Sequence, residues 1–134
     1  MSDTDTRAER AANLFDLRRI IGGVFTAWGV LLQRARHVVS ENARVDATAA
    51  ALEAQDLERV GELLDESHAS LRDDYEASVP EVEATVERLK AAGAAGARMV
   101  GGGFGGSVLA LLPPGVARPA GALAVAPHAA ARLL

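Results

Sequence analysis

The chain has 134 residues, no cysteine and a formal net charge of −4, from 14 basic and 18 acidic residues. This length suits one domain with one modest core, and the acidic balance argues against a nucleic-acid partner. The lack of cysteine excludes a disulfide framework and a thiolate metal site, and it is typical of a reducing compartment. Every acidic residue precedes Gly93, so the part of the chain that follows Gly93 is predicted to form apolar strands and turns.

The first 33 residues differ in character from the rest. Residues 1–13 are polar with alternating charges and no apolar period, which predicts a disordered or frayed start. The apolar run Ile20–Leu32 is shorter than the ~20 residues that a membrane-spanning helix needs. We expect a helix there that is buried against the protein. The alternative is a helix in a membrane interface, which the flanking arginines and the Trp also suit.

Two helices are expected next, joined by a short link into an antiparallel pair. In the first, Arg34–Glu53, one apolar stripe recurs at helical spacing and the charged residues lie on the other faces. Asp56 can cap the second helix, which has its own apolar side. The stripe residues are Val38, Val45, Ala49 and Leu52 in the first helix and Leu57, Val60, Leu64 and Leu71 in the second.

A third helix is predicted to begin at Ser78, because Ser78 and Glu81 can form a capping box and Pro80 suits the first turn. Gly93 is typical of the residue that follows a helix end. The side chains expected to face the core are Val82, Val86 and Leu89.

The polar stretch Ser67–Ser78 contains Ser, His and Asp, but adjacency in sequence does not make a catalytic triad. We interpret it as a helix end at which Arg72, Asp73 and Asp74 satisfy one another and nearby backbone groups. The three histidines are too far apart in sequence for a zinc helix, so no metal site is predicted. They are His37, His68 and His128.

Two apolar runs predict strands joined by a glycine-rich loop that exceeds what a hairpin turn needs. Glycines can align their N–H groups as a cradle for an anion such as phosphate. A glycine bulge that merely bends a hairpin explains the pattern equally well, so both interpretations stay open. Lys90, the only lysine, is the single candidate for a phosphate-binding lysine. The candidate site residues are Gly101, Gly102, Gly103, Phe104, Gly105, Gly106 and Ser107.

Pro/Gly turns follow, and Ala122–Ala126 is predicted to be a last short strand. The order of helix, helix, helix, strand, strand, turn, strand predicts an α+β fold. In such a fold the helices pack on one face of a small, largely antiparallel sheet.

These motifs together resemble a known family. Ser67–Glu76, the Pro-Glu helix start and Gly96–Met99 before the glycine loop are similar to the C-terminal part of galactokinases, which are GHMP sugar and metabolite kinases. Arg34–Val45 resembles the helix that opens that part. The similarity covers about Arg34–Leu112, with an echo at residues 125–127 and 131–132. We therefore expect an unrelated segment at 1–33 and a GHMP kinase C-terminal domain, ferredoxin-like but incomplete, at 34–134.

The resemblance implies phosphoryl transfer from Mg-ATP to the 1-hydroxyl of galactose in the cytoplasm, with residues 101–107 beside the substrates. ATP and Mg²⁺ are the implied cofactors. The family's catalytic Asp, sugar-binding segment and ATP-binding loop lie in an N-terminal half that nothing before Arg34 resembles. No catalytic residue is assigned, and we expect the chain alone to be inactive. A separately encoded N-terminal half is the expected partner, and galactose, N-acetylated galactose and arabinose all stay open as substrates.

The chain also departs from the family pattern. Val100 stands where the family has Thr, Val79 stands where Cys is common, and a Pro/Gly turn replaces a helix before the last strand. Loss of that helix would leave one face of the sheet bare. The alternative function is therefore a non-catalytic interaction module that uses this face and the Ile20–Leu32 helix, or else a gene remnant.

Overall fold

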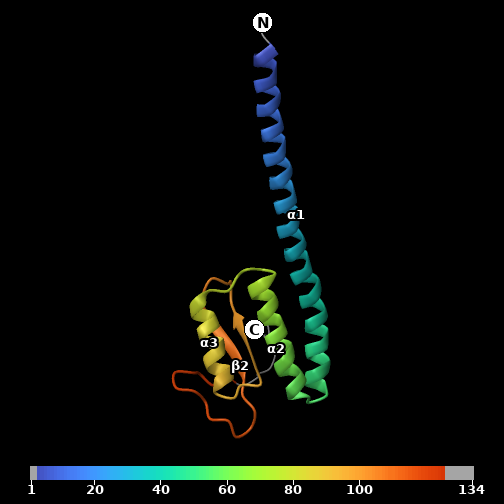
Figure 1. Cartoon of the computed structure of the whole chain (residues 1–134). Helices are drawn as coiled ribbons and strands as arrows, with labels where there is room; N and C mark the ends of the chain where they lie inside the picture. The colour runs from blue at the N-terminus through green and yellow to red at the C-terminus, as the bar shows by residue number, and fades with distance from the viewer. Residues whose placement is uncertain (1–2, 126–134) are drawn as a thin grey trace, which may run out of the picture.

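The computed structural model describes the backbone of residues 3–125 and the side chains of residues 21–125. Helices α2 and α3 and a β-hairpin form the body, and α1 packs along α2 and projects far beyond it (Figure 1). The predicted α+β class is confirmed. In chain order the elements are α1 (Asp3–Glu53), α2 (Leu57–Asp73), α3 (Pro80–Ala91), β1 (Gly96–Val100) and β2 (Ser107–Leu111).

The N-terminal helix α1 is longer than predicted, because it runs without a break from Asp3 to Glu53. The prediction of disorder is therefore wrong from Asp3 to Asn13. Residues 3–21 contain neither Gly nor Pro and are rich in Ala, Arg and Leu, which have a high intrinsic helix propensity. The predicted boundary between residues 33 and 34 falls inside this helix. The expectation that the Ile20–Leu32 run is buried against the protein is wrong for its described side chains, since residues 21–32 are all exposed.

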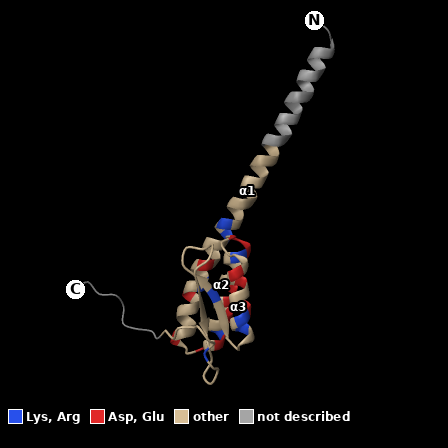
Figure 2. Ribbon diagram, turned by 90° about the vertical axis from the view of Figure 1, so that its left-hand side faces the viewer, with Lys and Arg blue, Asp and Glu red and all other residues tan. Residues whose placement is uncertain are grey.

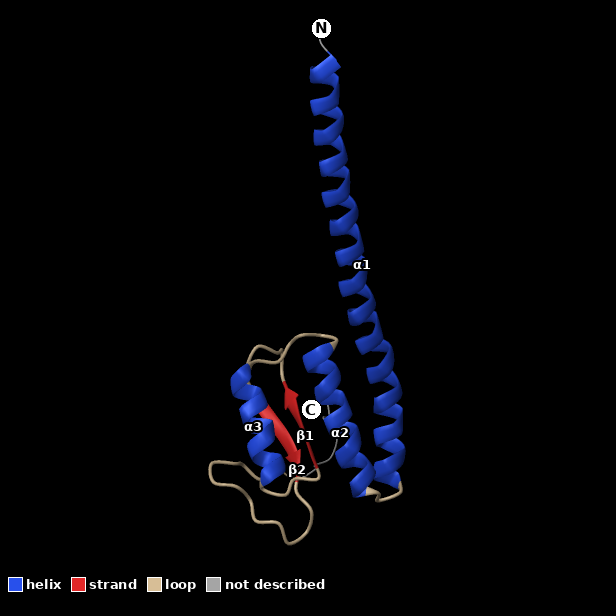
Figure 3. Cartoon of the chain, in the orientation of Figure 1, coloured by secondary structure: helices blue, strands red, loops and turns tan. Residues whose placement is uncertain are grey.

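The antiparallel pairing of α1 and α2 is confirmed (Figure 3). The carboxylate of Asp56 accepts a hydrogen bond from the Arg59 backbone N–H over 3.0 Å, which is the predicted cap of α2. Gln55 takes a positive φ of 59° in the turn between the two helices.

The face of α1 that meets α2 is not the apolar stripe marked by the sequence. Val38, Val45 and Leu52 are 53%, 66% and 55% exposed. The covered face mixes alanines with polar side chains that bond to each other, to α2 or to the backbone of α1, namely His37, Ser40, Glu41, Arg44, Ala47, Thr48 and Ala51. This polar face can pack against α2 because its side chains form hydrogen bonds with Ser67 and Ser70 of α2. These bonds replace the hydrogen bonds to water that the polar groups lose on burial.

One part of the core lies between α1 and α2, at Ala51, Val60 and Leu63, and the other lies between α3 and one face of the hairpin. Ala97 pairs with Ala110 and Met99 pairs with Val108 across the antiparallel strands, so these four side chains point to one side. Val82 and Leu89 of α3 are buried against them, as the sequence predicts. The opposite face is partly bare, with Leu109 44% exposed.

The start of α3 differs from the predicted capping box. Val79 is the N-cap residue and makes no side-chain cap, whereas the Ser78 hydroxyl donates to Glu83. Pro80 does lie in the first turn, and Gly93 follows the helix end with a φ of 95°. Glu83 lies one turn into the helix and draws the hydroxyl of Ser78 away from the backbone N–H groups.

Helix α2 lies along the edge of β1 that faces away from β2. The Ala97 N–H donates to Asp65 Oδ1 over 2.8 Å, and the Met99 N–H points at His68 Nδ1, 3.4 Å away. Gly61 and Gly96 allow the two backbones to touch, because a Cβ on Gly96 would lie 2.0 Å from the Gly61 carbonyl oxygen. The side chains of α2 thus occupy an edge that would otherwise be open to another strand.

The predicted last strand is not formed in the described part of the chain. Residues 122–125 are turn and irregular structure, and Ala126 lies outside the described residues. Leu123 and Val125 are 88% and 82% exposed, so none of the residues that the structure describes packs against this segment. The sheet therefore has two strands, β1 and β2, among the residues described. The echoes at 126–127 and 131–132, and His128, lie outside those residues as well.

None of the described helices has an apolar stretch long enough to cross a bilayer.

Candidate functional site

The glycine loop, residues 101–106, joins β1 to β2 in a conformation that few other residues adopt. Gly101, Gly103, Gly105 and Gly106 have φ values of 108°, 87°, 131° and 99°. Phe104 also takes a positive φ, 56°, with its ring 76% exposed. The glycines are therefore required by backbone conformation, and the loop is more than a two-residue hairpin turn.

One hydrogen bond anchors the loop to the segment between α2 and α3. The Phe104 N–H donates to the Ala77 carbonyl over 2.7 Å. Gly103 lies against the same residue, since a Cβ there would be 3.0 Å from Ala77 Cβ. Within residues 3–125, the N–H groups of Gly101, Gly102, Gly103, Gly105 and Gly106 donate to no protein acceptor. These amides are free to meet an anionic ligand.

A cavity of about 230 Å³ opens beside the loop. Arg98 is the one charged residue among the described residues that line it, and the Arg98 side chain is 30% exposed. The lining combines this cation with glycine backbone and the ring of Tyr75, from Leu71, Tyr75, Ala77, Arg98, Met99, Gly101, Gly102 and Gly103. That chemistry suits a negatively charged group such as phosphate.

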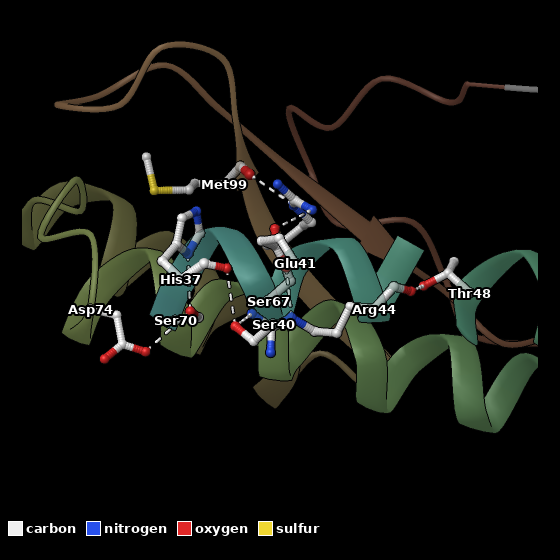
Figure 4. A network of polar contacts seen from close by, with 10 residues as sticks. His37, Ser40, Glu41, Arg44, Thr48, Ser67, Ser70, Asp74 and Met99 are labelled. Carbon is white, nitrogen blue, oxygen red and sulfur yellow. Dashed lines mark hydrogen bonds and ion pairs between the residues drawn. The ribbon is translucent and has the colours of Figure 1, made fainter. Parts of the chain in front are cut away.

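The Glu41 carboxylate of α1, which lies beside Ser67 of α2 in Figure 4, holds Arg98 of β1. The Arg98 Nε donates to the Met99 carbonyl over 3.2 Å, and a terminal nitrogen lies 3.5 Å from Glu41 Oε2. Glu41 also accepts hydrogen bonds from Arg44, over 2.6 Å, and from Ser67, over 2.7 Å. Burial raises the pKa of Glu41, but these hydrogen bonds and the charges of Arg44 and Arg98 outweigh it and hold the pKa below its usual range.

The same junction contains a Ser, a His and an Asp, but not in the order of a catalytic triad. Ser70 lies in the middle, with its Oγ 3.0 Å from His37 Nδ1 and donating to Asp74 over 3.3 Å (Figure 4). In a triad the histidine lies between the other two. Both His37 and Ser70 are buried, so this group links α1 to α2.

The polar helix end is partly as predicted. Arg72 donates two hydrogen bonds to Asp73, over 2.7 and 2.9 Å, and the bond from Arg72 holds the pKa of Asp73 below its usual range. Asp74 instead meets Arg36 of α1 at 3.2 Å. The sequence did not predict this partner, because it requires knowing that α1 passes the end of α2.

The structure does not bring Lys90 to the loop. Its Nζ bonds to Asp65 and to the Ala95 carbonyl, just before β1, whereas the glycine loop follows the other end of that strand. It lines a separate cavity of about 540 Å³ that also carries Glu58, Glu62 and Asp65. No three His, Asp or Glu side chains among the described residues form a group that could hold a metal ion.

Arg98 was missed by the sequence reasoning as a site residue. Its position next to the glycine run was the available signal, but β-strand alternation alone does not say that its side chain reaches Glu41 of α1. The contacts with Glu41 and the Met99 carbonyl hold it there.

Comparisons with known proteins fit this arrangement. The family model described as "GHMP kinases C terminal" matches residues 48–126. The crystal structure of Lactococcus lactis galactokinase complexed with galactose is similar to this chain, at 49% sequence identity and a TM-score of 0.59. That match covers 62% of this chain and 22% of the galactokinase, so the chain spans about a fifth of that protein's length. The residues matched by the family model contain α2, α3, both strands and the glycine loop. The chain therefore belongs to the GHMP kinases and has a galactokinase-like C-terminal domain.

Proposed function

We propose that this chain supplies the glycine-loop side of a galactokinase active site, which transfers a phosphoryl group from ATP to the 1-hydroxyl of galactose. The 49% identity to a galactokinase carries the proposal. The free glycine amides and Arg98 beside the 230 Å³ cavity support it, because phosphoryl transfer needs positive charge and N–H donors around the phosphates.

The residues present fit the phosphate part of this chemistry better than the metal part. Gly101, Gly102 and Arg98 can bind and orient negatively charged oxygens at the cavity. Mg²⁺ prefers carboxylate and water ligands, and no carboxylate lines the cavity among the described residues. When bound, the metal would neutralise the phosphate charge. We assign the ligands of the metal, the catalytic carboxylate and the ATP-binding loop to a separate N-terminal half. We place both parts of the enzyme in the cytoplasm.

The test is an ADP-release assay of the purified 134-residue chain with ATP and galactose. We expect no galactose-dependent ADP from the chain alone, and turnover after addition of the N-terminal part of a galactokinase. Galactose-dependent turnover by the chain alone would contradict the assignment of the catalytic groups to another half. N-acetylgalactosamine and arabinose in the same restored assay identify the sugar.

Arg98→Gln should lower the restored turnover at least about tenfold, by loss of a charge-assisted contact to phosphate. Arg88→Gln is the matched control, because Arg88 is exposed on α3 and away from the cavity. Failure of the added half to restore any turnover would favour the alternative, a non-catalytic interaction module. The exposed apolar side of α1 is the separate observation in favour of that alternative.

A further inference from the structure

Helix α1 carries a long apolar stripe that no described part of the chain covers. Ten large apolar side chains along it are each between 45% and 72% exposed. They are Ile21, Val24, Phe25, Trp28, Leu31, Leu32, Val38, Val39, Val45 and Leu52. Single exposed apolar residues are ordinary, but a continuous row of this length marks an interaction surface.

The stripe follows the spacing of a coiled-coil seam. Starting at Ile21, steps of three and four residues alternate without exception to Leu52, through more than four heptads. Every residue of this seam is exposed. Phe25, Leu32 and Val39, seven residues apart, widen the seam on one side. The seam residues are Ile21, Val24, Trp28, Leu31, Ala35, Val38, Asn42, Val45, Ala49 and Leu52.

The seam lies on the side of α1 that faces away from α2. Residues in contact with α2, such as His37, Glu41 and Ala51, are centred about 110° around the helix axis from the seam residues of the same stretch, at 3.6 residues per turn. A second helix can therefore lie on the seam without displacing α2. Figure 1 shows that the N-terminal part of α1 also projects clear of the body.

The exposed area is large enough for a stable dimer. At their exposed fractions, the ten side chains present on the order of 1,000 Å² per copy, or ~2,000 Å² for two copies, against the ~1,200–2,000 Å² of a typical specific interface. A seam that repeats its own pattern is also self-complementary, as a two-fold interface requires.

A membrane surface and the rest of a galactokinase fit the stripe less well. Membrane-surface helices carry Lys and Arg on their polar face, but residues 20–33 carry no charge, and this part of α1 is uniformly tan in Figure 2 where it is drawn as described. Six of the ten stripe residues lie between Ile21 and Leu32, in the segment that does not resemble a galactokinase. A kinase half therefore does not account for them.

We propose that two copies of this chain associate through the exposed seam of α1. Asn42, the one polar residue in the seam, meets a polar group of the second copy and helps to set the register of the two helices. The association does not depend on kinase activity.

The test is the mass of the 134-residue chain in solution, by light scattering and sedimentation equilibrium over a range of concentrations. We expect twice the monomer mass of 13.9 kDa. Val24→Asp, in the seam, should raise the dissociation constant of the dimer at least about a hundredfold, since it places a charge in a desolvated interface. Val30→Asp is the matched control, because Val30 is similarly exposed on the same helix but lies outside the seam.

Trp28, the only Trp and a seam residue, gives a second readout. Its emission should shift to shorter wavelength as concentration rises in the wild type and in Val30→Asp, but not in Val24→Asp. Circular dichroism of both variants shows whether α1 stays helical. A monomeric wild type, equal weakening by both substitutions, or a wild type that stays monomeric and binds lipid vesicles would each overturn the proposal.

Discussion

The Ser67 hydroxyl of α2 donates to Glu41 Oε2 of α1 over 2.7 Å, and this hydrogen bond joins the two helices beside Arg98. Glu41 is the point at which α1, α2 and β1 meet, because it also accepts from Arg44 and faces the Arg98 guanidinium. A carboxylate with three partners on three elements fixes both the helix pair and the side chain that lines the candidate site.

Replacement of Glu41 by Gln should lower the free energy of unfolding by about 1–3 kcal/mol, because Arg44 loses its charged partner in a half-buried setting. Urea unfolding of the chain measures this. Asp46→Asn is the control, since Asp46 is an exposed acid on the same helix. Equal loss in both variants would mean that the network at Glu41 contributes nothing beyond a surface charge.

Stability should also fall in acid through the same residue. The pKa of Glu41 is below its usual range in the folded chain, so folding favours the ionised form. Its contribution is complete above the unfolded carboxylate pKa of about 4.3 and is lost as the pH falls through the lower folded value. Unfolding measured from neutral pH to about pH 3 should therefore show a shallower acid slope in Glu41→Gln than in the wild type or Asp46→Asn. Identical slopes would contradict this.

The sequence predicted those features that depend on local chemistry. The Asp56 cap, the Gly93 helix end, the buried faces of Val82 and Leu89 and the strand–glycine–strand unit are each set by neighbours in the chain. The resemblance to galactokinases also rested on contiguous motifs, and the family is confirmed. The role of residues 101–107 beside a substrate stays a prediction.

The predictions that failed concern features that depend on which elements pack against each other. Val38, Val45, Ala49 and Leu52, one part of the seam of α1, were marked as an apolar stripe, but only the packed α2 shows that the polar face with Glu41 is the covered one. Ala122–Ala126 has strand-like residues, yet a strand needs a partner edge, and the described part of this segment has none. Residues 3–13 lack an apolar period, but helix propensity along a continuous α1 is enough to include them.

Two substitutions of Asp65 should distinguish its hydrogen bond with the Ala97 N–H, at the edge of β1, from its ion pair with Lys90. Asp65→Ala leaves that N–H without an acceptor and should cost about 1–3 kcal/mol. Asp65→Asn keeps an acceptor oxygen and loses only the half-exposed pair with Lys90, which is worth at most about 1 kcal/mol. Hydrogen exchange at the Ala97 amide, with urea unfolding, distinguishes the two. Equal losses would assign the stability to the ion pair.

The touching backbones of α2 and β1 give the sharpest test of the fold. A Cβ on Gly96 would lie 2.0 Å from the Gly61 carbonyl oxygen, and backbone atoms cannot move aside as a flexible side chain can. Gly96→Ala should therefore destabilise the chain by about 3 kcal/mol or more. Gly102→Ala is the control, since nothing lies within 4 Å of its Cβ position. Its unfolding free energy should change by less than about 1 kcal/mol, and a Gly96→Ala protein of wild-type stability would show that α2 does not lie this close to β1.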